Sequence, residues 1–168
     1  MITFAYADNS EAVTKSLGEF QGAITNQQPG LAQIADDFRE LIARQFASEG
    51  RTAGTMWAAR KSSLVGAAPR GRPGQGHSLP LLVRTGALRD SLTQPVAAGH
   101  VEESDRQTLS IGSRLPYALF HQTGTRRMPA RPIIVLRDER TAKWAEFVRA
   151  AIEEKTPLLA AKQMGGEK

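Results

Sequence analysis

The 168-residue sequence contains no cysteine. The chain therefore has no disulfide framework, no thiolate zinc site, no iron–sulfur cluster and no cysteine nucleophile. It also lacks any run close to the roughly 18–20 apolar residues that cross a bilayer, and no basic region precedes a long apolar core at its start. These absences predict a soluble, unsecreted protein without a membrane partner.

Histidine is scarce, and the few histidines are scattered along the chain. His77, His100 and His121 form no metal-binding spacing, so we expect no bound metal. No Gly-x-Ser-x-Gly segment is present to carry a hydrolytic serine. The glycine-rich residues 66–78 match neither the Walker nor the dinucleotide-binding spacing, so we expect no cofactor.

Adjacent acids occur at Asp36-Asp37 and at Glu102-Glu103. Neighbouring side chains diverge on a helix and alternate across a strand, so neither pair is expected to converge on a substrate. Together with the missing motifs, this predicts that the protein is not an enzyme and has no small-molecule substrate.

The net charge of +5 is unevenly distributed along the chain. Residues 1–50 hold three Lys/Arg and seven Asp/Glu, a balance of −4, whereas residues 51–90 hold seven and one, a balance of +6. Residues 113–136 contain four arginines and no acid. The pattern fits either a solvated basic surface or a site that meets acidic protein or DNA.

Apolar residues recur at helical spacing in three stretches. The clearest stretch is residues 31–50, which predicts a helix ending near Gly50. Its apolar face consists of Leu31, Ile34, Phe38, Leu41, Ile42 and Phe46. An earlier helix is expected over residues 10–24, weakened by two glycines, and a last helix begins at its cap Asp138 and ends before Pro157.

Shorter elements are expected between these helices. Thr85 is placed to cap a helical turn through Leu92, and a second turn at 117–121 should stop at Gly124. Short strands are expected at residues 2–7, 99–103, 107–112 and 132–136, the middle two forming a hairpin.

These elements predict an α+β fold in which two main helices pack on a small, mostly antiparallel sheet. The length suits a single domain, which we place at residues 1–157, followed by a loose tail at 158–168. Residues 66–78 have almost no apolar side chains to bury and are expected to form a long, mobile, basic central loop.

Residues 114–132 place Tyr117 and His121 one helical turn apart, before a glycine turn and three arginines. One interpretation packs both rings on the sheet with their polar tips hydrogen-bonded. The other places Arg126, Arg127 and Arg131 on an exposed turn, where their guanidinium groups bind carboxylates of a neighbouring subunit. The two interpretations are compatible.

Five ordered blocks resemble one known family. They are Phe46, Gly50 and Trp57; residues 81–92, which include Thr85, Gly86 and Leu88; Ile111-Gly112; residues 117–124, from Tyr117 through His121 to Gly124; and Met128-Pro129-Ala130-Arg131-Pro132. In this order they resemble the Mu-like phage virion morphogenesis family over approximately residues 2–155. The resemblance implies that Trp57, Thr85, Gly86, Leu88, Tyr117, His121, Gly124 and Pro132 form a structural motif.

The resemblance also implies a non-enzymatic structural protein of a tailed phage or prophage, located in the virion. It would act in tail completion or in head-tail joining at the neck, as an oligomeric ring. Its expected partners are copies of itself and tail terminator, tail tube or head-completion (connector) proteins. We expect the contacts to be made by Arg70, Arg72, Arg126, Arg127 and Arg131.

A different class of protein also fits the charge pattern. The same arginines could face phosphate in a basic accessory protein that contacts phage DNA without sequence preference. Base-specific recognition is not expected, because no helix-turn-helix, ribbon or zinc-finger signature is present.

Overall fold

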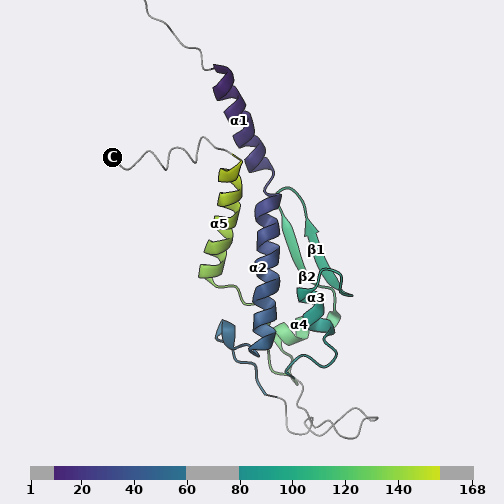
Figure 1. Ribbon diagram of the computed structural model, residues 1–168. Coiled ribbons are helices and arrows are strands. Elements are labelled where there is room, and N and C mark those ends of the chain that lie inside the picture. Colours follow the sequence, from purple (N-terminus) through teal and green to yellow (C-terminus); the bar gives the residue numbers. More distant parts are fainter. Residues whose placement is uncertain (1–9, 60–79, 156–168) are drawn as a thin grey trace, which may run out of the picture. The chain divides into compact units, whose positions relative to one another are not determined.

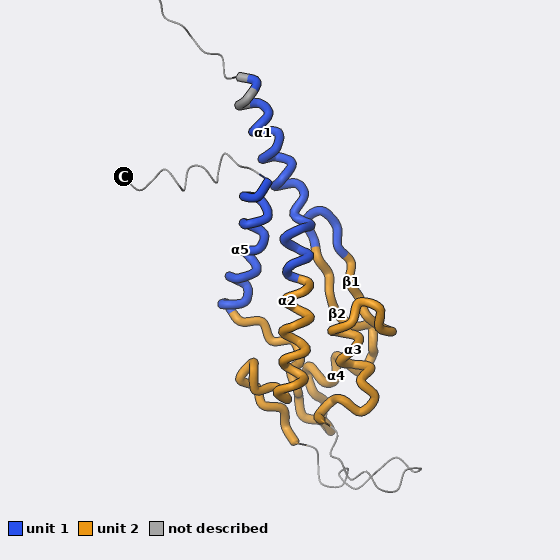
Figure 2. Tube along the Cα trace, in the orientation of Figure 1, with its two compact units in different colours: residues 1–34, 104–108, 138–168 blue, residues 35–103, 109–137 orange. Residues whose placement is uncertain are grey.

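A computed structural model describes residues 10–59 and 80–155. The strand expected at 2–7, the loop at 66–78 and the tail at 158–168 lie outside these ranges. The chain divides into two compact units (Figure 2). Unit 1 comprises residues 1–34, 104–108 and 138–168, and unit 2 comprises residues 35–103 and 109–137. The assignment of residues 1–157 to one domain stays a prediction.

The described residues form an α+β fold, as predicted (Figure 1). In chain order the elements are α1 (Ser10–Thr25), α2 (Gln28–Ala47), the 3₁₀ turn η1 (Arg51–Ala53), α3 (Ala87–Thr93), β1 (His100–Ser104), β2 (Leu109–Ser113), α4 (Pro116–Thr123) and α5 (Asp138–Glu154). The three long helices and both short helical turns lie where their patterns predict them.

Unit 1 contains α1, α5 and the first turns of α2. Helix α1 contacts α5, and α2 approaches α5 closely at Gly30. A Cβ atom at Gly30 would lie 2.8 Å from Cα of Val148. Only glycine permits this approach, because any side chain there would collide with the backbone of α5.

The core of unit 2 forms along the apolar face predicted for α2. Phe38, Ile42 and Phe46 are all at most 3% exposed. Trp57, Leu88, Leu92 and Ile133 are buried as well. The helical periodicity therefore identified the buried face of α2 correctly, because an apolar stripe along a helix is removed from water only when it packs against another surface.

The predicted β-hairpin is confirmed: β1 and β2 pair as a two-stranded sheet. Four residues join the strands, which is too short for a parallel crossover, so the pair is antiparallel. In the turn, the Asp105 carboxylate accepts hydrogen bonds from the backbone N–H groups of Gln107 and Thr108, both at 2.8 Å. These hydrogen bonds hold the pKa of Asp105 below its usual value.

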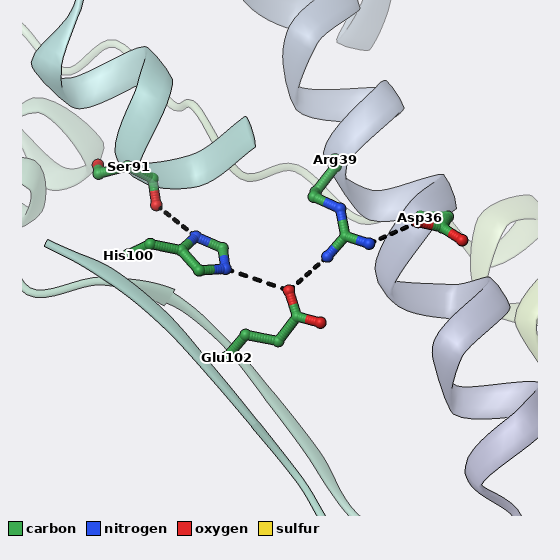
Figure 3. A network of polar contacts seen from close by, with 5 residues as sticks. All are labelled: Asp36, Arg39, Ser91, His100 and Glu102. Atoms are coloured by element: carbon green, nitrogen blue, oxygen red, sulfur yellow. Dashed lines mark hydrogen bonds and ion pairs between the residues drawn. The ribbon is translucent and has the colours of Figure 1, made fainter. Parts of the chain in front are cut away.

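A chain of polar contacts links α2, α3 and β1 within unit 2 (Figure 3). Arg39 donates to Asp36 and to Glu102, and Glu102 Oε2 lies 3.1 Å from His100 Nε2. The other ring nitrogen of His100, Nδ1, lies 2.9 Å from the carbonyl oxygen of Ser91. Because a carbonyl and a carboxylate can only accept, both contacts are hydrogen bonds together only when the ring carries two protons.

The adjacent acids diverge, as predicted. Asp36 is exposed and pairs with Arg39, whereas Asp37 is 6% exposed. On β1, Glu102 belongs to the polar chain and Glu103 pairs with Arg114 at 3.4 Å. The two carboxylates of each adjacent pair therefore lie in different environments and do not face a common site.

We predict that unit 2 loses stability in acid partly through Glu102. Burial alone would raise the pKa of Glu102, but hydrogen bonds from His100 and Arg39 and their charges outweigh burial and lower this pKa. The stabilisation is therefore complete above the pKa of the unfolded chain and is lost as the pH falls through the lower pKa of the folded chain. The free energy of unfolding, measured by urea titration from pH 7 to pH 3, should fall less steeply in Glu102→Gln.

Glu40→Gln is the matched control for this experiment. Its carboxylate belongs to an exposed i,i+4 pair with Arg44 on α2, at 3.5 Å, and such pairs contribute about 0–1 kcal/mol. A Glu102→Gln variant whose pH profile coincides with that of Glu40→Gln would contradict the prediction.

The strand predicted at residues 132–136 is wrong, since this segment belongs to neither strand of the sheet. A side chain of α4 takes its backbone hydrogen bonds instead. Gln122 Oε1 accepts from the N–H groups of Ile133 and Ile134 at 2.8 and 3.0 Å, and Gln122 Nε2 donates to the carbonyl of Ile134 at 2.8 Å. An apolar, β-prone run can thus be part-buried, with its backbone hydrogen bonds formed by a side chain and not by a neighbouring strand.

Replacing Gln122 with leucine should lower the free energy of unfolding by about 3 kcal/mol, because it leaves three part-buried backbone groups without partners. Leu119→Gln changes an exposed position of the same helix, 63% accessible, and should stay within about 0.5 kcal/mol. Chemical denaturation of both variants measures the difference. Equal stabilities would show that water replaces the Gln122 amide without loss.

Candidate functional site

The described part of unit 2 contains a pocket of about 610 Å³. Apolar side chains form much of its wall, namely Ala59, Leu81, Leu82, Leu88, Met128 and Pro129. The remaining wall is basic or weakly polar and consists of Arg84, Thr85, Tyr117, His121, Arg127 and Arg131. We call this site the arginine pocket. It brings together three of the sequence blocks, 81–92, 117–124 and 128–132.

The charge of the arginine pocket is one-sided, because its lining includes three arginines and no acid. Arg84 and Arg127 are exposed. Neither guanidinium forms an ion pair within residues 10–59 and 80–155. The described residues therefore leave the positive charge of these two side chains uncompensated.

A tight turn after α4 presents two of the predicted interface arginines. Gly124 ends α4, as predicted, and Thr125 and Met128 then form an antiparallel bridge around Arg126 and Arg127. The Thr125 hydroxyl oxygen accepts from the N–H groups of Arg127 and Met128 at 3.3 and 3.1 Å. Both arginines of this closed turn are exposed, as expected.

A second turn positions α3 beside the pocket. The N-cap of α3 is Gly86, with a left-handed φ of 82° and no side-chain cap. Thr85 precedes it, and its hydroxyl oxygen accepts from the N–H of Ala87 at 3.3 Å. The cap predicted at Thr85 is therefore shifted by one residue, although Thr85 still binds the first helical N–H. Leu88, the second residue of α3, is 2% exposed and lines the pocket.

The expectation of an exposed Arg131 is wrong. Arg131 is only 8% exposed. Its Nε donates to the carbonyl of Ala58 at 2.8 Å, and its Nη2 donates to the carbonyl of Ala59 at 3.3 Å. The guanidinium thus binds the backbone after Trp57, because those carbonyls have no strand partner and a five-donor group can satisfy two of them at once.

Tyr117 and His121 lie on the pocket wall with their rings edge to face, 6.1 Å between centroids. The hydrogen bond expected at the polar tip of His121 is not found at Nδ1, which is buried and has no partner among the described residues. Burial lowers the pKa of His121, and the positive charge of Arg131 lowers it further. Both effects favour the neutral form of His121, whose ring forms part of the pocket wall.

An aromatic pair adjoins the segment that Arg131 binds, because Trp57 directly precedes Ala58 and Ala59. Trp57 is 3% exposed and meets Phe46 edge to face at 5.4 Å. Its Nε1 donates to the carbonyl of Pro132 at 2.8 Å, and Gln45 Nε2 donates to the same oxygen at 3.3 Å. The blocks around Phe46, Trp57 and Pro132 thus form one buried cluster.

Two of the predicted contact residues, Arg70 and Arg72, lie outside the described residues. Sequence reasoning missed Arg84 as a pocket residue, although its position directly before Thr85-Gly86 in a strongly basic segment was an available signal. It also missed Gln45, which is 1% exposed. A glutamine next to Phe46 on the buried side of α2 was the corresponding signal.

Residues 10–59 and 80–155 contain no group of three His, Asp or Glu side chains suited to a metal ion. Within the same ranges, no helix has both the length and the apolar character needed to span a membrane.

The chain was compared with known proteins in three ways. No curated protein and no solved structure matches it. The model of the phage virion morphogenesis family matches residues 8–153. This range is most of the chain and includes all five sequence blocks. The chain therefore belongs to the phage virion morphogenesis family.

Proposed function

We propose that the protein is a non-catalytic, ring-forming component of the virion that acts in tail completion or in head-tail joining at the neck. Its family gives the chain a structural role in building the phage particle. The proposed partners are further copies of the chain and tail terminator, tail tube or head-completion (connector) proteins. Closed rings arise when one surface of a subunit binds a different surface of the next.

The arginine pocket is the observation that supports this role best. Apolar walls combined with arginine and an aromatic ring are typical of protein interfaces. The exposed guanidinium groups of Arg84 and Arg127 can each bind a carboxylate through two parallel hydrogen bonds. The acidic first fifty residues provide carboxylates on every neighbouring copy, so unlike charges would orient successive subunits.

A charge reversal in the pocket tests this function. In Arg127→Glu the pocket would repel acidic partners, so light scattering and negative-stain imaging should show fewer rings at every protein concentration. Arg51→Glu is the matched control, because Arg51 is also exposed but lies outside the pocket. Absence of rings in the wild type at high concentration and with purified tails, or equal ring formation by both variants, would contradict the proposal.

A second function, contact with phage DNA, is favoured by one observation. Arg126 and Arg127 are adjacent, exposed and unpaired among the described residues, which is an arrangement that phosphate can bind. Binding to random-sequence duplex should then weaken steeply with salt, with a slope proportional to the number of phosphates neutralised. A flat salt response, or equal slopes for wild type and Arg127→Glu, would exclude this function for the turn.

A further inference from the structure

The lining of the arginine pocket specifies the chemistry of its occupant. Its leucines, Met128 and Pro129 favour apolar side chains, while Arg84 and Arg127 favour a carboxylate. Tyr117 and His121 add ring surface to the same wall. A polyphosphate backbone satisfies the arginines but not the apolar wall. The occupant that satisfies both is a peptide with apolar side chains next to an acid.

Three segments of this chain lie outside the described residues, and their charges differ. Residues 60–79 contain Arg60, Lys61, Arg70 and Arg72 and no acid, and residues 156–168 contain two lysines and one glutamate. Like charge disfavours both as occupants of a site with three arginines. Residues 1–9 contain one acid, Asp8, and neither lysine nor arginine. Of the three segments, only residues 1–9 have a negative net side-chain charge, which is the sign that the pocket requires.

The apolar pattern of residues 1–9 also fits. Ile2, Phe4 and Tyr6 alternate with small residues, so an extended backbone places all three side chains on one face. Asp8 continues the same face, about 7 Å beyond Tyr6. A strand of this kind can insert its large side chains between the leucines while its carboxylate reaches an arginine at the rim.

We propose that the arginine pocket of one copy receives residues Ile2–Asp8 of a second copy. This inference rests on the proposed ring, in which each subunit gives its N-terminal segment to the next. The occupied pocket is completed by the donor's Asp8, paired with Arg84 or Arg127, and by its apolar side chains against the wall.

The proposed ring favours a second copy as the donor, because each subunit of a closed ring gives one surface to its neighbour and receives a different surface from the other side.

Engineered cysteines test the contact without interference, because the chain has none of its own. Full-length Tyr6→Cys and full-length Met128→Cys are mixed and oxidised, and the covalent heterodimer is quantified on non-reducing gels. Met56→Cys is the control partner, since Met56 is 71% exposed and lies outside the pocket lining. We expect heterodimer yields at least about ten-fold higher for Met128→Cys, as effective concentrations in a docked pair are in the millimolar range.

A competitor defines the chemistry of the contact. A synthetic peptide of residues 1–12 should suppress the Tyr6–Met128 disulfide, and the same peptide carrying Asp8→Lys should not. Pro129→Cys serves as a second pocket position should Met128→Cys fold poorly. Equal yields for pocket and control cysteines would overturn the inference.

Two further outcomes separate the inference from the proposed function. An internal disulfide in the Tyr6→Cys/Met128→Cys double variant, seen as a faster-migrating monomer, would overturn donation by a second copy. Rings that form in light scattering without any Tyr6–Met128 disulfide would refute the inference and leave the proposed function standing. Absence of rings would refute the proposed function itself.

Discussion

Replacing Trp57 with alanine is expected to lower the free energy of unfolding by about 3–5 kcal/mol. Trp57 is 3% exposed, and its ring meets Phe46 edge to face at 5.4 Å. The substitution removes this contact, leaves a cavity and withdraws the donor that lies 2.8 Å from the carbonyl of Pro132. For a domain with a total stability of about 5–15 kcal/mol, the loss is a large fraction.

The effect of Trp57→Ala should extend to the arginine pocket. Arg131 holds the backbone of Ala58 and Ala59, the two residues directly after Trp57, so the tryptophan anchors one wall of the site. Trp57→Phe keeps the aromatic contact and loses the hydrogen bond, so its expected loss is about 1–2 kcal/mol. Met56→Ala changes the exposed neighbour and should be within about 0.5 kcal/mol. Urea denaturation measures all three, and a Trp57→Ala loss no larger than that of Met56→Ala would refute the packing argument.

The helices could be predicted because their signals are local. The buried stripe of Phe38, Ile42 and Phe46 repeats every three or four residues, and a helix must turn such a stripe toward a partner. Gly124 marked the end of α4 for an equally local reason, since a helix commonly ends at a residue with positive φ, and Gly124 has φ 77°. The hairpin followed from two short runs around Asp105, which binds its own turn.

Two predictions were wrong, the strand at residues 132–136 and the exposed Arg131. In both cases a side chain forms hydrogen bonds with backbone groups that are distant in the sequence. Residues 132–136 have the composition of a strand, but Gln122 provides their hydrogen bonds from α4. Arg131 belongs to a basic cluster, yet its guanidinium binds carbonyls more than seventy residues earlier in the chain. No periodicity or residue spacing in the sequence predicts either pairing, because both depend on which segments the fold brings together.

The arginine pocket could be predicted only in part. The two exposed arginines of the 125–128 turn follow from the glycine that precedes it and the lack of apolar neighbours. The concave apolar wall does not, since Ala59, Leu88 and Met128 come from three separate segments. The sequence does show an excess of positive charge in its central segments. The structure shows that three arginines of these segments line one pocket.

A single methyl group at Gly50 should destabilise the protein almost as much as the loss of the Trp57 ring. Gly50 lies between α2 and η1 with φ 91°, a left-handed conformation that costs other residues about 1–2 kcal/mol. A Cβ atom there would lie 2.1 Å from the carbonyl oxygen of Thr55 and 2.6 Å from Cδ1 of Trp57. Overpacking of this kind adds about 1–3 kcal/mol, so we expect the two effects together to lower the stability of Gly50→Ala by about 2–5 kcal/mol.

The control for Gly50→Ala is the same substitution where nothing crowds the new atom. Gly18 lies within α1, and a Cβ atom there would meet nothing within 4 Å. Gly18→Ala should therefore stabilise the helix by about 0.5–1 kcal/mol, because alanine loses less backbone entropy than glycine. Thermal unfolding should move in opposite directions for the two variants. Since both add one methyl group, opposite signs can arise only from the local backbone and its neighbours, and a Gly50→Ala protein as stable as wild type would mean that the turn around Trp57 can rearrange freely.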